Sequence, residues 1–129
     1  MLRRQLRVLI ADDHRLFAES LMLALGQDER INIVGIADDG RQAVELTREL
    51  RPDVVLMDIH MPVVDGVTAT SEIKAEGLPS KVILLTDREV GATGTNVFEA
   101  GANAFVQKHQ SLDSFMSVFT DVASLVATP

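Results

Sequence analysis

The stretch VVLMDIHMPVVDG, residues 54–66, places a carboxylate directly after an apolar run. Residues 54–57 form a short apolar run in which apolar and polar residues do not alternate, which is typical of a strand buried on both faces of a sheet. Asp58 then stands at the carboxyl end of that strand, either as a helix cap or as a reacting group. Asp65 is the better-placed cap, because it directly precedes the next helical segment whereas Pro62 intervenes after Asp58.

Further apolar runs on both sides of this one alternate with segments of helical period. The runs predict strands at residues 7–11, 31–36, 54–57, 81–85 and 103–106, and the first four, led by valine and isoleucine, are expected to be buried on both faces. Four segments carry apolar stripes at helical spacing: Phe17, Leu21, Ala24 and Leu25; Ala43, Leu46, Thr47 and Leu50; Val67, Thr70 and Ile73; and Leu112, Phe115, Phe119, Val122 and Val126. A fifth, glycine-rich and weaker helix is expected near residues 95–100, closed by Gly101 as its C′ residue.

This strict alternation predicts an α/β fold in one domain over residues 1–129. Five strand–helix units indicate a flavodoxin-like, doubly wound, five-stranded parallel sheet with strand order 2-1-3-4-5 and five helices. No internal repeat, low-complexity tract or linker interrupts the pattern. If the natural protein has a second domain, we expect it to lie outside this chain.

Composition narrows the class of protein further. The 129 residues include no cysteine, which excludes disulfides and thiolate metal sites, and 12 basic against 19 acidic residues leave a formal charge of −7. This acidic balance argues against nonspecific binding of nucleic acid, which needs a positive surface. The apolar run at residues 8–11 is too short for a signal peptide, and no segment approaches the roughly 18 apolar residues of a membrane span. We therefore expect a soluble cytoplasmic protein without a membrane partner.

Polar residues follow the predicted strands at the edge where open parallel sheets bind their ligands. In the expected strand order they converge on that edge: Asp12 and Asp13, Asp58, Thr86 with Asp87 next to it, and Lys108. Clustered carboxylates repel one another, and a hard divalent cation such as Mg²⁺ or Mn²⁺ would relieve the repulsion. With a lysine and a hydroxyl nearby, the cluster suits phosphoryl transfer, with Asp58 as the nucleophile that forms an aspartyl phosphate.

The motifs, taken in order, resemble the receiver domain of bacterial two-component response regulators. The resemblance rests on the acid pair after VLIA, on MDIHMPVVDG, on VILLTD and on GANAFVQK, and it covers the whole chain. The segments LIADDHRLFAESLMLAL and IVGIADDGRQAVELTRELRPDVVLMDIHMP are most similar to the NarL/FixJ (LuxR-type) group. That group implies a C-terminal helix-turn-helix domain, through which alone DNA would be bound and which is absent from this chain.

The resemblance also implies roles for individual residues. Asp58 would be the phospho-acceptor. Mg²⁺ would be bound by Asp13 directly, by Asp12 directly or through water, by Asp58, and by the backbone carbonyl of His60.

Lys108 would hold the phosphoryl group, and Thr86 and Phe105 would form the switch pair. Their movement would change the surface made by the helix near residues 95–100, the strand at 103–106 and the last helix. The partner would be a sensor histidine kinase, and the domain would be a signalling switch rather than an enzyme, although it promotes its own phosphorylation and dephosphorylation.

Several alternatives remain open. One of Asp12 and Asp13 could cap the first helix while the other binds metal, with Asp13 favoured as the ligand. Asp87 stands where most receivers have a small residue, so we expect slow phosphorylation that Asp87→Ala would speed.

Together with the glycine-rich residues 91–94, Asp87 also supports an alternative function, a phosphorylation-independent interaction module. Extra apolar residues on the last helix indicate either a wide core contact or a partner face, for a homodimer or an output domain: Met116, Val118 and Leu125. Arg7, near the basic start, is expected to be solvated.

Overall fold

A computed structural model of the chain describes residues 5–87 and 98–126. Five strands form one parallel sheet in the order β2-β1-β3-β4-β5, which confirms the predicted order. The strands are β1 (Leu6–Ala11), β2 (Ile31–Ala37), β3 (Val54–Asp58), β4 (Lys81–Thr86) and β5 (Ala104–Gln107). The helices in the described part are α1 (Arg15–Leu25), α2 (Gly40–Leu50), α3 (Gly66–Ala75) and α4 (Leu112–Ala123).

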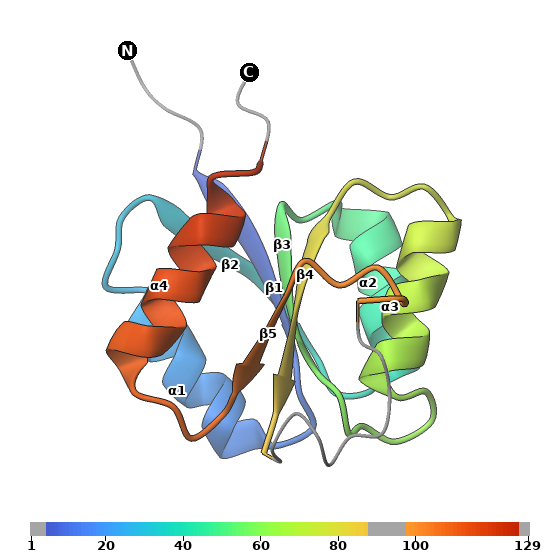
Figure 1. Cartoon of the computed structure of the whole chain (residues 1–129), viewed down its shortest axis with the longest axis horizontal. Helices are drawn as coiled ribbons and strands as arrows, with labels where there is room; N and C mark the ends of the chain where they lie inside the picture. Colours follow the sequence, from blue (N-terminus) through green and yellow to red (C-terminus); the bar gives the residue numbers. More distant parts are fainter. Residues whose placement is uncertain (1–4, 88–97, 127–129) are drawn as a thin grey trace.

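The helices cover both faces of the sheet, as Figure 1 shows, with α1 and α4 on one side and α2 and α3 on the other. Because side chains alternate along a strand, each strand contributes to two separate cores. In β3, Val54 and Leu56 pack beneath α1 and α4, whereas Val55 and Met57 pack beneath α2 and α3. The predicted doubly wound α/β architecture is therefore confirmed.

Burial of the strands agrees with the prediction except at the edge of the sheet. β3 is buried along its whole length, and β1 and β4 are buried from their second or third residue onward. β2 is mostly half-buried, so the expectation that it is covered on both faces was wrong. As an edge strand it has a neighbour on one side only, and its run of isoleucine and valine does not reveal that position.

One helix prediction reaches beyond the described residues, and another needs correction. The predicted helix at residues 95–100 lies partly outside the described residues, and residues 98–100 form a turn before Gly101, whose φ of 104° is the left-handed conformation expected of a C′ glycine. The sequence pattern predicts Leu112 in the core stripe of the last helix, but this residue is 54% exposed. It is the first residue of α4, which reaches the core one turn later at Phe115.

Arg7 is not an ordinary solvated residue. Its Nη1 donates to the carbonyl oxygens of Leu50 at 2.6 Å and Arg51 at 3.0 Å, at the end of α2. Its backbone N–H also donates to Asp53 Oδ2 at 2.8 Å. A cation at a helix C-terminus satisfies carbonyls that have no partner within the helix, so Arg7 joins β1 to the α2–β3 turn.

The loop between β3 and α3 is held tightly at both ends. Asp65 accepts a hydrogen bond from the backbone N–H of Thr68 at 2.7 Å, which confirms it as the cap of α3. A Cβ on Gly66 would lie 2.1 Å from the backbone oxygen of Asp58, so this position requires glycine. Within this loop, Val63 is 78% exposed and has a φ of 70°, an unfavourable conformation for a β-branched residue.

Among the described helices, none is long and apolar enough to cross a lipid bilayer. The longest, α4, has 12 residues, whereas a span needs about 20.

Candidate functional site

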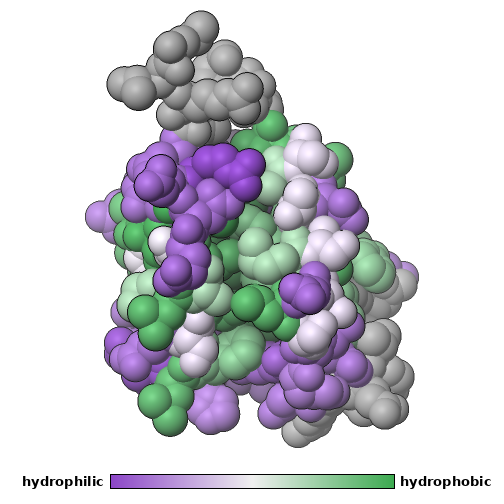
Figure 2. All heavy atoms as spheres, turned by 90° about the vertical axis from the view of Figure 1, so that its left-hand side faces the viewer, coloured by the Kyte–Doolittle hydropathy of each residue, from purple (hydrophilic) through white to green (hydrophobic). Residues whose placement is uncertain are grey.

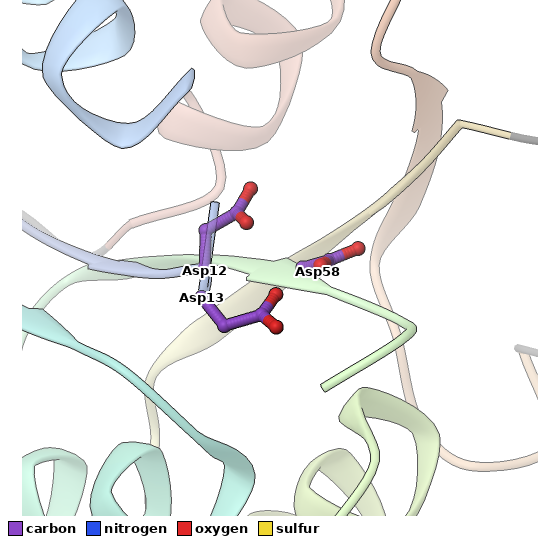
Figure 3. Close-up of side chains that lie close together, drawn as sticks. All are labelled: Asp12, Asp13 and Asp58. Carbon is purple, nitrogen blue, oxygen red and sulfur yellow. The ribbon is translucent and has the colours of Figure 1, made fainter. Parts of the chain in front are cut away.

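Three carboxylates lie together at the carboxyl edge of the sheet (Figure 3). Asp12 and Asp13 follow β1, and Asp58 ends the neighbouring β3. One carboxylate oxygen from each of the three lies within 4.8 Å of the others. The predicted convergence of these three carboxylates is therefore present.

The lysine that follows β5 reaches the same cluster. Lys108 Nζ lies 2.7 Å from Asp12 Oδ2 and 3.4 Å from Asp58 Oδ2. The lysine side chain is only 10% exposed, and both carboxylates are almost fully buried. Because buried ion pairs are little screened by solvent, the ammonium is held firmly between the two acids.

Strand alternation explains why these three side chains meet. Asp12, Asp58 and Lys108 each lie two positions after a strand residue that is buried beneath α1 and α4: Ile10, Leu56 and Val106. Side chains two positions apart on a strand point to the same face. The sheet therefore delivers all three toward the side covered by α1 and α4.

Asp58 carries a perturbed carboxyl group. Burial, and then the neighbouring charge of Asp12, raise the pKa of Asp58 to about 6. Lys108 and the backbone N–H of His60, which lies 3.3 Å from Asp58 Oδ1, act in the opposite direction. Two negative charges in one buried place disfavour ionisation unless a cation compensates them.

Backbone contacts fix the position of Asp58. The N–H of Ile59 donates to the carbonyl oxygen of Leu85 at 2.9 Å, which extends the pairing of β3 with β4 past the acid. The N–H of Gly66 donates to the carbonyl oxygen of Ile59 at 2.8 Å, where α3 begins. Asp58 thus ends a strand and caps no helix, and the cap interpretation belongs to Asp65.

The first helix is not capped by either member of the acid pair. The N-cap of α1 is His14, whose side chain makes no capping bond, and Asp12 Oδ1 accepts the backbone N–H of His14 at 2.8 Å instead. The alternative in which Asp12 or Asp13 caps α1 is therefore wrong. Asp13 is exposed beside the buried pair, so its carboxylate is accessible from solvent.

The two predicted switch residues lie on the opposite face of the sheet. Thr86 is fully buried and lies two positions after Leu84, which packs beneath α2 and α3, so the two side chains share that face. Phe105 in β5 is half-buried and packs against the core beneath α2 and α3. The hydrogen bond from the N–H of Lys108 to the carbonyl oxygen of Thr86, at 2.6 Å, ties the ends of β4 and β5 together.

The donor set suits a hard divalent cation. Oxygen ligands from two buried and one exposed carboxylate are typical of Mg²⁺ rather than of zinc. Within the described residues Asp12 Oδ2 accepts no hydrogen bond of good geometry, and its contact with Lys108 is an ion pair, so lone pairs of this oxygen remain available. Asp12, Asp13 and Asp58 could therefore hold a metal ion, with the exposed His60 beside them.

Phe17 also belongs to the site, although the sequence indicated only a core residue. Lys108 Nζ lies over its ring, 4.7 Å from the centroid. An aromatic residue in the first turn after the acid pair is the signal that could have identified it. Apolar periodicity alone does not distinguish a ring that touches the core from one that also touches a charged group.

Comparison with known proteins agrees with this geometry. Residues 8–120 match the response regulator receiver domain family. The transcriptional regulatory protein NarL of Mycobacterium tuberculosis is 34% identical over 119 residues, which is 92% of this chain and 55% of that protein. The chain thus spans about half the length of this relative.

Solved structures agree as well. The signal receiver domain of NarL from Mycobacterium tuberculosis has a TM-score of 0.88 and 33% identity, and the match covers 95% of this chain and 98% of that one. A chain of the CheX–CheY–BeF₃–Mg complex from Borrelia burgdorferi has a TM-score of 0.84 and 26% identity, over 92% of this chain and 90% of that one. Because the family model matches residues 8–120 and the fold agrees with these solved structures, the chain belongs to the response regulator receiver domain family.

Proposed function

We propose that Asp58 accepts a phosphoryl group from a phosphohistidine of a sensor histidine kinase, and that the domain transmits this event as a change of surface. The observation that carries the proposal is the buried Asp58 with Lys108 Nζ 3.4 Å from its Oδ2 and with two further carboxylates beside it. An acid at the end of a central strand, paired with a lysine and clustered with other acids, is poorly explained as a stabilising feature. It is well suited to a reaction that delivers a negatively charged phosphoryl group.

The reaction itself needs little from the protein beyond position and charge. An oxygen of the Asp58 carboxylate attacks phosphorus as the bond from phosphorus to the imidazole nitrogen breaks, and the bonding electron pair stays on that nitrogen. Lys108, now between Asp12 and Asp58, can turn its ammonium to a phosphoryl oxygen without leaving the site. The fixed backbone around Asp58 holds the attacking oxygen at the rim of the sheet.

Mg²⁺ is the cation that we assign to the acidic cluster. Asp12, Asp13 and Asp58 would hold it through their carboxylates and His60 through its backbone carbonyl. When bound, Mg²⁺ would neutralise charge on the carboxylates and on the phosphoryl oxygens. The presence of BeF₃ and Mg in the solved CheX–CheY complex that contains a similar chain supports this assignment.

Phosphorylation would be read out through Thr86 and Phe105. Both residues lie on the face covered by α2 and α3, so a movement of the Thr86 hydroxyl toward a phosphoryl group would leave space on the side where Phe105 packs. A change at β5 would reach α4, which follows this strand, and residues 98–103, which precede it. We infer that this surface controls transcription through a DNA-binding domain outside the present chain, because the similar NarL is a transcriptional regulatory protein of which the match covers only 55%.

We also propose that the domain self-associates through the last helix. Met116 and Val118 are half-buried against the core, which accounts for part of the apolar excess of α4. Leu112 and Leu125 stay 54% and 58% exposed at the two ends of this region. Sedimentation with and without beryllofluoride would test the dimer, and a strict monomer in both conditions would contradict it.

Incubation with acetyl phosphate and Mg²⁺, followed by the intact mass of the protein, tests the central proposal. We expect a phosphoryl adduct that is absent in Asp58→Asn and in the presence of EDTA. Asp65→Asn is the matched control, because Asp65 caps α3 seven positions further along the same loop and should leave the adduct in place. No adduct on the wild type would favour the alternative, a phosphorylation-independent interaction module, for which the exposed Asp87 beside Thr86 is the specific support.

A further inference from the structure

Phe17 places an aromatic ring against the lysine of the site. Lys108 Nζ lies 4.7 Å from the centroid of the ring, within the distance of about 6 Å at which a ring face attracts an ammonium. The same ammonium contacts Asp12 and Asp58. Lys108 is therefore held by two carboxylates and by one ring.

The fold explains why this contact forms. Lys108 points to the face of the sheet that α1 covers, and α1 begins three residues after Asp12. The hydrogen bond from the N–H of His14 to Asp12 Oδ1 ties the start of the helix to the site. Phe17, in the first turn of α1, is thus carried over the carboxyl edge of the sheet.

The ring attracts the ammonium of Lys108 without occupying its N–H donors, which a third carboxylate would do. An ammonium has three N–H donors on a flexible four-carbon stem, so its direction depends on what surrounds it. A ring face attracts the charge but accepts no conventional hydrogen bond, and so leaves the donors for oxygen ligands. It also limits the access of water, since the Lys108 side chain is only 10% exposed.

We propose that Phe17 is a positioning residue for phosphoryl transfer, whose ring holds the Lys108 ammonium at the acidic cluster. The proposal rests on the proposed function of Asp58 and Lys108. It assigns to Phe17 an effect on the rate of phosphorylation that is separate from its contribution to folding.

The surroundings of Phe17 favour this role over simple core packing. The residue is only half-buried, and it lines a pocket of about 230 Å³ between α1 and α4, to which Leu21, Leu112 and Phe115 also contribute. Figure 2 shows hydrophobic side chains gathered on this face of the molecule. Because Phe17 lines this pocket, we expect Phe17→Tyr to be accommodated without overpacking.

Three substitutions separate the ring face from apolar bulk. Phe17→Leu keeps apolar contact and removes the π-system, and we expect it to lower the initial rate of labelling by acetyl phosphate about threefold to tenfold. Phe17→Tyr keeps the ring and should stay within about twofold of the wild type. Leu21→Ala, one turn further along α1 and on the same pocket, should lower the thermal midpoint and leave the rate unchanged.

A measurement that does not depend on phosphorylation tests the contact itself. The ring current of Phe17 should shift the Hε signals of Lys108 upfield in the NMR spectrum, in the wild type and in Phe17→Tyr but not in Phe17→Leu. Equal Lys108 shifts in all three proteins would overturn the proposal. So would equal labelling rates in Phe17→Leu and Phe17→Tyr on a protein that is labelled normally.

Failure of the proposed function can be distinguished from failure of the role of Phe17. A wild type that takes no phosphoryl group, although Lys108 shows the ring-current shift, would refute the role of Asp58, and the rate effect of Phe17 with it. A labelled wild type without that shift would overturn the role of Phe17 alone.

Discussion

Asp58→Asn should stabilise the protein in magnesium-free solution at neutral pH, because it removes a buried charge that lies beside Asp12. Burial and Asp12 raise the pKa of Asp58 to about 6, whereas the ordinary value is 3.8. A difference of one pKa unit corresponds to about 1.4 kcal/mol, so the charged carboxylate costs the folded state about 3 kcal/mol at pH 7. Asparagine keeps the size of the side chain and removes this cost, while Lys108 retains Asp12 at 2.7 Å.

The sign of the pH dependence follows from the raised pKa. Below the unfolded-state pKa of 3.8, Asp58 is protonated in both the folded and the unfolded protein, so its charge costs no stability. The cost grows as the pH rises from there to the folded-state pKa of about 6. The gain in unfolding free energy of Asp58→Asn should therefore be full at neutral pH and roughly half as large near pH 5. Added Mg²⁺ should narrow the difference at neutral pH, since a ligand that binds only the folded wild type stabilises it by mass action.

Urea denaturation in EDTA at the two pH values measures this gain directly. Asp121→Asn, an exposed position on α4, is the matched control and should change the unfolding free energy by less than about 0.5 kcal/mol. An Asp58→Asn protein that is no more stable than the wild type at neutral pH would refute this prediction. An equal gain in unfolding free energy at both pH values would refute it as well.

Three further predictions follow from the loops around the site. Val63→Gly should raise the unfolding free energy by about 1 kcal/mol, because it relieves a φ of 70° at an exposed valine, and an unchanged urea midpoint would contradict this strain. Asp87→Ala should speed labelling by acetyl phosphate, since it removes an exposed acid next to Thr86 at the rim, and an unchanged rate would refute that effect. Gly66→Ala should lower stability by about 1 to 3 kcal/mol and slow labelling, because its Cβ would lie 2.1 Å from the backbone oxygen of Asp58; a normal melting temperature would show that the loop can yield.

The order of the strands and the position of the acidic cluster could be predicted from sequence, because both depend on local pattern. Short apolar runs alternate with helical stripes, and right-handed crossovers leave few arrangements for five parallel strands. Once that order is assumed, the residues at the strand ends must meet at one edge. The meeting of Asp12, Asp58 and Lys108 is predictable in this way, and the structure shows it in their ion pairs.

Other features depend on neighbours that no local pattern reveals. The half-exposed state of β2 depends on its place at the sheet edge, and the role of Arg7 depends on where α2 ends. The contact of Phe17 with Lys108 joins residues far apart in sequence, and the positive φ of Val63 is set by the tight path from β3 to α3. The predicted effect of Asp87 on phosphorylation also depends on which groups surround it in the folded protein. That effect stays a prediction.

The most direct test of the central claim is to locate the phosphoryl group on the chain. Borohydride reduction converts an aspartyl phosphate to homoserine, which peptide mass spectrometry can place at one residue. After treatment with acetyl phosphate and Mg²⁺, we predict homoserine at Asp58 and unmodified aspartate at the neighbouring Asp12 and Asp13. Homoserine at either of those two residues, or at none of the three, would contradict the account.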